Sequence, residues 1–590
     1  MQKSFLNLLF ITFVTKNQKR NYHSGTFISM SRKIFWYPLI FSLFLFTLTA
    51  CNDARQPPVS DIAKTPEELD IKATDIIRGA LEFAEANEGR IDDTIQLVYT
   101  KPAQLIYEKN GFTTLWSGKE QWKPLADSLL HFISEAKLYG LFPEDYHFNW
   151  LDSLSKFVLR DTIAMKDAVK WAKADLMLTD GLLHIIKDLK LGRLTRDSMT
   201  QRKDSVLSDS FYLQQFETIQ QKGALTEILQ SVEPTHRGYI ALKNEIKQFL
   251  DSADNRVYTN VPSSKKDSAA FSQALQRRLY EGGFIDFDSV RTDSSQLAEA
   301  VKKFQRSKKI KIDGKAGEET IRLLNESDKD KFVRIAITLD RYKMLPEKMP
   351  ARYVWVNLPG YNMQLVEDDS ILLTSRIICG KNITRTPLLT SAISDMITYP
   401  QWTIPNSIIV KEILPGLKKD TNYLSRKGYS LIDSKGDVIN PASVDWSKYK
   451  KGIPYKVVQG SGDENALGIL KFNFPNKYAV YLHDTNQRYL FSRTMRSLSH
   501  GCVRVQEWEE LAYYIIRYDF KDKLIEEAFA AEDSLATWLE RKEKHTIPVR
   551  KRLPVYIRYF TCEGKKGKLL FHDDIYGDDK ALHQKFFAGK

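Results

Sequence analysis

Residues 481–504 read YLHDTNQRYLFSRTMRSLSHGCVR, and this stretch decides how the rest of the chain is interpreted. The β-branched and aromatic run from Tyr478 to Leu482 predicts a short strand that ends at His483. A loop of 15 residues then leads to the string Ser-His-Gly-Cys. Cys502 stands just ahead of a segment whose apolar residues recur at helical spacing from Trp508 onward. The pattern therefore predicts a histidine and a cysteine at the ends of two elements that a fold can bring together.

These residue types suit nucleophilic catalysis by a thiol. Acyl transfer by cysteine needs a base that takes the thiol proton and donors that stabilise the oxyanion. A free thiol has a pKa of about 8.5, so a nearby imidazole is a common activator. The predicted helix start after Cys502 would favour its thiolate through the helix dipole. Gly501 lacks a Cβ, which lets a substrate backbone approach, and the amides of Gly501 and Cys502 are natural oxyanion donors.

The two strings together resemble a known signature. The string Ser499-His500-Gly501-Cys502-Val503-Arg504, together with His483-Asp484-Thr485 and with 15 residues between His483 and Ser499, resembles the signature of the L,D-transpeptidases with a YkuD-type catalytic domain. Phe474-Pro475-Asn476 and the segment PQWTIPNSI at 400–408 are similar to neighbouring stretches of the same enzymes. The order of the regions resembles the large YcbB-like type, with scaffold and peptidoglycan-binding domains ahead of the catalytic domain.

The resemblance assigns roles to the residues of the signature. It implies Cys502 as nucleophile, His483 as general base, and His500 as a residue that shapes or assists the site. Ser499 and Gly501 would fix the turn. Arg504, where many relatives have Asn, would hold the loop or contact a substrate carboxylate. The base would be oriented by a backbone carbonyl near Asp484. The loop arginines, Arg488, Arg493 and Arg496, either bind acidic groups or form a solvated basic surface.

The implied reaction is acyl transfer through a thioester. A tetrapeptide donor stem of peptidoglycan loses D-Ala, and the amine of an acceptor stem completes a 3→3 crosslink, with no cofactor or metal. Water in place of the amine gives an L,D-carboxypeptidase. Two alternatives come from other classes: a non-catalytic peptidoglycan-binding tether, and a metallohydrolase with His483, His500 and Cys502 as ligands. Carbapenems are implied as covalent inhibitors of Cys502.

The N-terminal segment has the pattern of a signal that targets a protein to the cell envelope. Arg32 and Lys33 precede an apolar run, and residues 1–50 form a signal peptide pattern that ends in Leu-Thr-Ala-Cys. The tetrapeptide resembles a lipobox, which implies cleavage before Cys51 and lipidation of its thiol. Buried lipid chains partition into a bilayer at about 0.8 kcal/mol per CH₂. We expect a periplasm-facing, lipid-anchored protein with a polar linker over 51–74. A transmembrane anchor is the alternative.

The body of the chain predicts a multidomain α+β protein. Helical spacing covers a scaffold region over 75–255, including a helix from Ala168 to Leu191. The unit 268–328 resembles a three-helix peptidoglycan-binding module. Residues 350–580 read as a β-rich catalytic domain, in which 411–466 form an inserted lid or a long loop. His131, His147 and His184 have no pattern of partners and are interpreted as ordinary structural histidines.

Composition excludes several other classes. The 590 residues are 43% hydrophobic and 27% charged, as in globular proteins rather than disordered chains. Removal of residues 1–50, with six basic and no acidic residues, lowers the formal charge from +13 to +7. That charge suits an anionic polymer and does not single out nucleic acid. The four cysteines contain no CxxC pair, and Cys379 and Cys562 are expected as buried free thiols, with a disulfide between them as the alternative.

Overall fold

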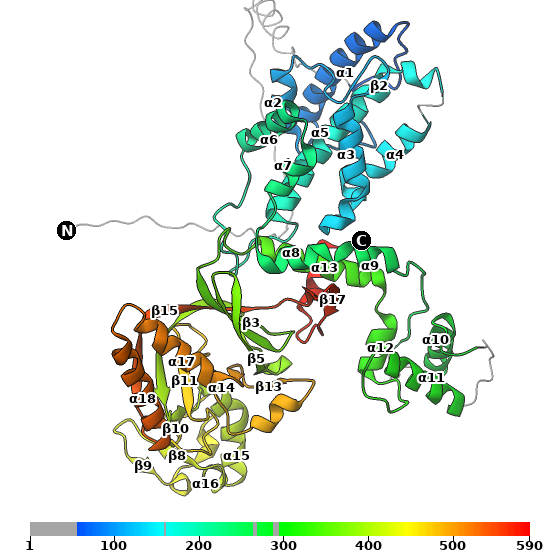
Figure 1. Ribbon diagram of the computed structural model, residues 1–590. Helices are drawn as coiled ribbons and strands as arrows, with labels where there is room; N and C mark the ends of the chain where they lie inside the picture. Colours follow the sequence, from blue (N-terminus) through cyan, green and yellow to red (C-terminus); the bar gives the residue numbers. More distant parts are fainter. Residues whose placement is uncertain (1–55, 158–160, 263–267, 287–293) are drawn as a thin grey trace, which may run out of the picture. The chain divides into compact units, whose positions relative to one another are not determined.

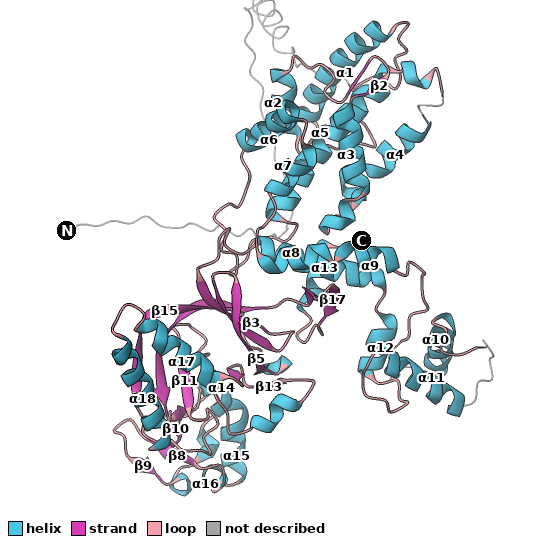
Figure 2. Ribbon diagram, in the orientation of Figure 1, coloured by secondary structure: helices cyan, strands magenta, loops and turns pink. Residues whose placement is uncertain are grey.

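The computed structural model describes residues 56–157, 161–262, 268–286 and 294–590. The predicted signal peptide and Cys51 lie outside these residues. Figure 2 shows helices through the N-terminal regions and strands concentrated in the C-terminal one, which confirms the multidomain α+β class. Among the described helices, none combines the length and the apolar character that crossing a bilayer requires.

The N-terminal helical region is organised around α5, Ala168–Leu191, the helix predicted over the same residues. Almost all of its residues are buried, and two of its buried carboxylates hold neighbouring backbone. Asp175 accepts the amides of Leu115 and Trp116, while Asp180 accepts two amides at 98–99. The remaining elements are α1 Pro66–Ala86, α2 Thr100–Lys109, β1 Ser117–Gly118, β2 Gln121–Trp122, α3 Pro124–Ser134, α4 Phe148–Phe157, α6 Asp209–Lys222, α7 Leu225–Ser231, α8 Arg237–Asn244 and α9 Ile246–Ser252. Because α1 begins at Pro66, the last nine residues of the expected linker are helical.

The next unit consists of three short helices, α10 Ser268–Glu281, α11 Ser294–Ser307 and α12 Glu318–Asn325. Their apolar stripes meet in a core that includes Leu279, Val301 and Phe304. Gln305 is buried and fastens the Asp-Gly turn: its amide oxygen accepts the backbone N–H groups of Asp313 and Gly314. Gly314 has φ +70°, which explains a glycine at this turn. The predicted three-helix module is present.

Helix α13, Asp328–Lys343, precedes the β-rich region. It begins with a capping box between Ser327 and Asp330, whose side chains bond each other's backbone N–H groups. Its buried face joins residues of α8 and the C-terminal segment in one core, which includes Leu242, Ile337 and Phe560. The C-terminal segment contains β16 Cys562–Lys565, β17 Lys568–Phe571 and α19 Asp578–Phe586.

Eight of the described strands form a sheet that closes into a barrel. Their order is β5-β14-β12-β11-β6-β15-β3-β4, and β4 pairs again with β5. The short β13 adds to the end of β5. The bounds are β3 Arg352–Asn357, β4 Asn362–Glu367, β5 Ser370–Gly380, β6 Leu389–Thr398, β11 Leu470–Asn473, β12 Leu482–His483, β13 Ser497–Ser499, β14 Val503–Val505 and β15 Thr546–Arg558. Helices α17 Trp508–Asp519 and α18 Ile525–Glu540 cover part of the sheet, and Trp508 and Leu535 enter its core (Figure 1).

The insertion folds as a small unit of its own. Its core of Ile413, Leu431, Trp446 and Val457 is separate from the barrel core (Figure 1, yellow-green). Its elements are β7 Trp402–Thr403, α14 Asn406–Ile408, a π-helical turn Ile409–Ile413, α15 Leu414–Lys419, α16 Tyr423–Arg426, β8 Tyr429–Ile432, β9 Val438–Ile439 and β10 Lys456–Gln459. A plain long loop over 411–466 is therefore excluded, and the folded insertion starts earlier than expected because β7 pairs with β10.

Candidate active site

Two adjacent parallel strands carry the histidine and the cysteine of the signature. In their register His483 of β12 pairs with Arg504 of β14, and Leu482 pairs with Val503. Leu482 and Val503 are fully buried in the barrel core. Because side chains alternate along a strand, His483 and Arg504 lie on the opposite face, and so does Cys502, two residues before Arg504. The structure thus brings all three side chains to one face of two neighbouring strands.

The predicted strand from Tyr478 to Leu482 is wrong in its extent. Only Leu482 and His483 are in β12, and the preceding residues form a loop fastened by Asn476. The Asn476 side chain donates to the carbonyls of Phe474 and Val480 and accepts the amides of Tyr478 and Val480. These bonds hold the loop in place of strand pairing.

The expectation that a helix N-terminus stabilises the Cys502 thiolate is also wrong. Cys502 is followed directly by β14, and α17 begins only at Trp508. The dipole effect fades within the first turn of a helix, so α17 does not act on the sulfur in this way. Any stabilisation of the thiolate must come from other groups near the sulfur.

The turn that carries Cys502 is held by the residues before it. The Ser499 hydroxyl donates to the Cys502 carbonyl at 2.6 Å and accepts the Gly501 amide at 3.1 Å. Gly501 has φ +126°, a conformation that favours glycine. The Gly501 amide, expected as an oxyanion donor, is therefore already engaged. The Cys502 amide has no acceptor among the described residues and is the free donor of this turn.

The surroundings of Cys502 favour its protonated thiol. Burial raises the pKa of the thiol, while the backbone N–H and the hydroxyl of Tyr481, and then Lys471 and Arg504, act to lower it. The thiol faces the carbonyl oxygen of Ala479, with Sγ 3.8 Å from that oxygen. Ala479 has φ +54°, an unfavourable conformation for alanine. This environment favours the neutral thiol of Cys502 over its thiolate.

The imidazole of His483 is buried and neutral at neutral pH. Burial first, and then the positive charge of Arg504, lowers its pKa to about 3, while the carbonyls of Asp484 and Leu467 act in the opposite direction. Only 3% of the residue is exposed, and Nδ1 lacks a hydrogen-bond partner in the described part of the chain. A general base must be unprotonated before it acts, and this environment supplies that form.

His500 does not join Cys502, His483 and Arg504, and it contacts the insertion instead. Its Nε2 is 2.6 Å from Oε1 of Glu412, in the π-helical turn. Of the loop arginines, Arg488 pairs with Asp484, and Arg496 donates to backbone carbonyls of the barrel, including Ile377. Arg493 is exposed and makes no side-chain contact among the described residues. Of these three, only Arg493 remains free to bind an acidic group.

Sequence reasoning missed Lys471 and Trp402. Lys471 of β11 pairs with His483 of β12, and its ammonium lies 3.9 Å from the centre of the Tyr481 ring. Trp402, in the insertion, contacts the Tyr481 hydroxyl. In β11, Lys471 and Asn473 alternate with the buried Leu470 and Phe472, and this pattern predicts that the lysine lies on the outer face. Its position beside His483 follows only from the strand register.

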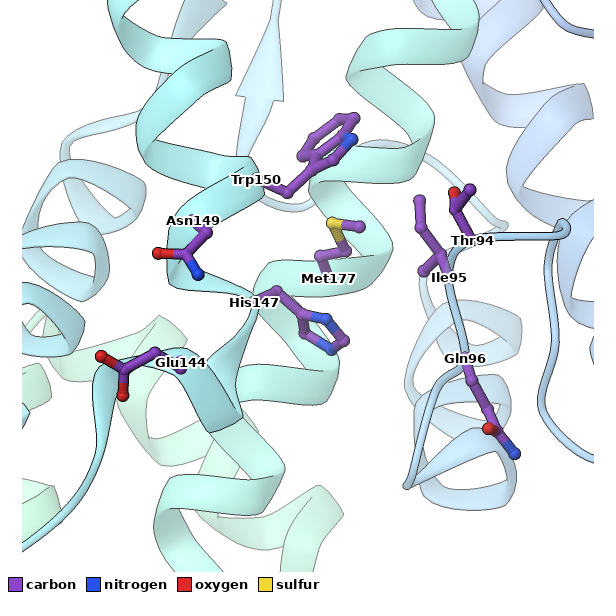
Figure 3. Close-up of a pocket in the computed structure, with 8 residues that line it drawn as sticks. All are labelled: Thr94, Ile95, Gln96, Glu144, His147, Asn149, Trp150 and Met177. Carbon is purple, nitrogen blue, oxygen red and sulfur yellow. The ribbon is translucent and has the colours of Figure 1, made fainter. Parts of the chain in front are cut away.

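Among the described residues, Cys379, Cys562 and His147 occupy structural positions. Cys379 and Cys562 are buried free thiols, and burial raises the pKa of each to about 12. Figure 3 shows a pocket of 290 Å³ in the N-terminal helical region, lined in part by His147, Trp150 and Met177. His147 Nε2 lies 2.8 Å from the buried Asp180 carboxylate, which satisfies that ring nitrogen. Within the described ranges, no group of three His, Cys, Asp or Glu residues is placed to bind a metal ion.

Comparison with known families agrees with the region order. Residues 351–519 match the family model described as "L,D-transpeptidase catalytic domain", residues 101–246 match "Scaffold domain", and residues 269–324 match "Putative peptidoglycan binding domain". The chain therefore contains an L,D-transpeptidase catalytic domain together with scaffold and peptidoglycan-binding domains.

Individual relatives match parts of the chain. A Haemophilus influenzae protein described as "Putative L,D-transpeptidase" is 37% identical over 250 residues, which are 42% of this chain and 49% of the relative. The chain thus spans about half the length of that relative. A solved L,D-transpeptidase from Stackebrandtia nassauensis is 18% identical with a TM-score of 0.14, covering 44% of this chain and 90% of that one. One from Xylanimonas cellulosilytica is 14% identical with a TM-score of 0.14, covering 52% and 97%.

Proposed function

We propose that this chain, whose residues 351–519 form an L,D-transpeptidase catalytic domain, crosslinks peptidoglycan stems by cysteine acyl transfer. The observation that carries the proposal is the placement of Cys502 and a neutral His483 on one face of the adjacent strands β12 and β14. A thiol and an unprotonated base in neighbouring positions are what covalent acyl transfer requires. The peptidoglycan-binding domain at 269–324 supports the substrate class.

The first half-reaction releases D-Ala. His483 takes the proton of the Cys502 thiol, and the thiolate attacks the carbonyl that joins the third stem residue to the terminal D-Ala. The Cys502 amide donates to the oxyanion that forms. When the tetrahedral intermediate collapses, the C–N bond breaks, and the leaving D-Ala amine receives the proton from His483. A thioester on Cys502 remains.

The second half-reaction uses the amine of an acceptor stem. The amine attacks the thioester carbonyl, His483 takes a proton from it, and the C–S bond breaks as the new amide forms. The proton returns to the thiolate of Cys502, so the site is regenerated. The product is a 3→3 crosslink. With water as acceptor the same steps give an L,D-carboxypeptidase, so the choice of acceptor separates the two activities.

We place the protein in the cell envelope, where peptidoglycan lies, with a lipid on Cys51 as anchor. Arg504 is proposed to hold the loop, since its Nη1 donates to Gln487 Oε1 at 3.1 Å. Glycine at 501 and the Ser499 hydroxyl keep the turn that presents the sulfur. His500 is proposed to assist indirectly, through the insertion that it contacts.

The test is incubation of the protein without residues 1–51 with purified tetrapeptide muropeptides, followed by mass spectrometry. We expect loss of D-Ala and a crosslinked dimer with the unchanged sequence, and neither with Cys502→Ala. A matched control is Cys379→Ala, which removes a buried thiol outside the face that carries Cys502. D-Ala loss without a dimer would establish the carboxypeptidase instead. Full activity of Cys502→Ala would refute the assignment of the nucleophile.

A further inference from the structure

Three strands, with the residues just before β12 and β14, carry six side chains in two rows on the outer face of the barrel. In the register of β11, β12 and β14, Lys471 pairs with His483 and His483 with Arg504. Side chains that face each other across neighbouring strands lie on the same side of the sheet. The next row, one alternation along, consists of Asn473, Tyr481 and Cys502. The imidazole is therefore flanked by a cation on each side, and Cys502 lies in the adjoining row.

Lys471 is a half-buried cation whose ammonium makes no ion pair and no hydrogen bond within the described residues. Burial lowers its pKa, which is the cost of an ammonium group removed from water. Asp395 of β6, the carboxylate whose charge acts on Lys471, accepts from Asn473 at 2.6 Å and from Ser394 at 2.7 Å instead. A half-buried ammonium whose described partner is an aromatic ring is only partly compensated, so it can stabilise an anion that forms beside it during function.

The position of the ammonium connects it to the sulfur. Lys471 Nζ lies 3.9 Å from the centre of the Tyr481 ring, and the hydroxyl of that ring acts to lower the pKa of Cys502. The charge interaction between Lys471 and Cys502 favours the charged form of both groups. With no helix N-terminus behind the cysteine, a thiolate there is favoured by the backbone N–H and the hydroxyl of Tyr481 and by the cations Lys471 and Arg504.

We infer that Lys471 is a positioning residue of this site, whose ammonium, held against the Tyr481 ring, stabilises the thiolate of Cys502 and keeps the neighbouring imidazole unprotonated. The inference rests on the proposed role of Cys502 as nucleophile. The groups that face Lys471 are His483 on β12 and Tyr481 just before it, Arg504 on β14 and Cys502 just before it, and Asp395 on β6. Of these, the anion created during the reaction is the thiolate.

The experiment measures alkylation of Cys502 by iodoacetamide as a function of pH, which requires no substrate. The rate is followed by mass spectrometry of the peptide that contains Cys502, in the protein without residues 1–51. We expect Lys471→Met to move the inflection upward by about one pH unit, a tenfold loss of thiolate at a fixed lower pH. Lys471→Arg keeps the charge and should restore the unchanged profile.

A matched control is Lys477→Met, because Lys477 also lies over a tyrosine ring, that of Tyr478, but is exposed. Its profile should equal that of the unchanged protein. Melting temperatures report whether Lys471→Met still folds, and Lys471→Gln provides a second neutral variant. An unchanged profile in both folded neutral variants would overturn the inference while leaving D-Ala release intact. A shifted profile in the Lys471 variants, together with no D-Ala release by the unchanged protein, would instead refute the proposed function.

Discussion

Glu412 Oε1 lies 2.6 Å from His500 Nε2, so the folded insertion touches the turn that presents Cys502. Both side chains are partly exposed, 31% for His500 and 47% for Glu412. Exposed pairs of this kind contribute about 0–1 kcal/mol to stability, so the contact can break without unfolding either part. A lid needs contacts of this kind. The pair holds the insertion against the turn, and breaking it costs little free energy.

Replacement of Glu412 by Ala should loosen this contact. We expect faster hydrogen–deuterium exchange in peptides that cover 404–418 and 497–502, because the insertion and the turn no longer restrain each other. The melting temperature should fall by no more than about 2–4 °C, as for a loss below 1 kcal/mol in a large domain. Asp445→Ala is the control, since the described side-chain partners of Asp445 are Ser447 and Lys448, both within the insertion. Unchanged exchange at 497–502 in Glu412→Ala would contradict the prediction.

Asn476 should control both the stability of its loop and the reactivity of the thiol. Its side chain makes four hydrogen bonds to the backbone of 474–480, and that loop places the Ala479 carbonyl at the thiol. Asn476→Ala should lower the free energy of unfolding by about 1–3 kcal/mol. Because burial raises the pKa of Cys502, a looser loop should speed its alkylation at neutral pH.

Chemical denaturation and the alkylation assay together check this prediction. Asn440→Ala is the control, because Asn440 caps an exposed turn of the insertion and should leave the alkylation rate unchanged. Slower alkylation in Asn476→Ala would show that the loop favours the thiolate rather than the thiol. That direction would be the opposite of the one expected from the Ala479 contact.

The long elements and the chemistry-bearing strings could be predicted from the sequence, and the short strands could not. Helix α5 was found over its full length because its apolar periodicity spans many turns. Strand β12 has two residues and β14 has three, too few for a periodic signal. The role of Lys471 depends on which strand lies beside β11. The position of the Ala479 carbonyl at the thiol depends on the hydrogen bonds that Asn476 makes. Both are tertiary facts that no local pattern contains.

His483 should make the folded state sensitive to acid. Its pKa is lowered from 6.5 to about 3, so between these values the unfolded chain binds a proton there and the folded protein does not. Stability from this group is therefore complete above pH 6.5 and is lost as pH falls toward 3, at most by roughly 1.4 kcal/mol per pH unit. His483→Gln should flatten the curve of unfolding free energy against pH in this window.

Urea denaturation at several pH values from 4 to 7 checks the sign. His236, whose pKa burial also lowers, stays in both proteins and contributes equally to each curve. The difference between the two curves therefore isolates His483. A difference that is constant with pH would mean that the imidazole of His483 is solvated enough to bind a proton in the folded state.

Carbapenems should acylate Cys502 and no other thiol among the described residues. The strained lactam carbonyl presents the same reaction as the stem amide: the thiolate adds, the C–N bond opens, and the nitrogen takes the proton from His483. The leaving nitrogen stays attached, so the intact mass should rise by the full mass of the drug. Cys379 and Cys562 should stay unmodified, because burial raises the pKa of each to about 12 and leaves almost no thiolate near neutrality. Cys502→Ala should show no adduct, and His483→Gln should form it at least tenfold more slowly, since the thiol then lacks its base. An adduct that forms equally fast in His483→Gln would remove His483 from the proton transfer and leave Lys471 as the group that activates the sulfur.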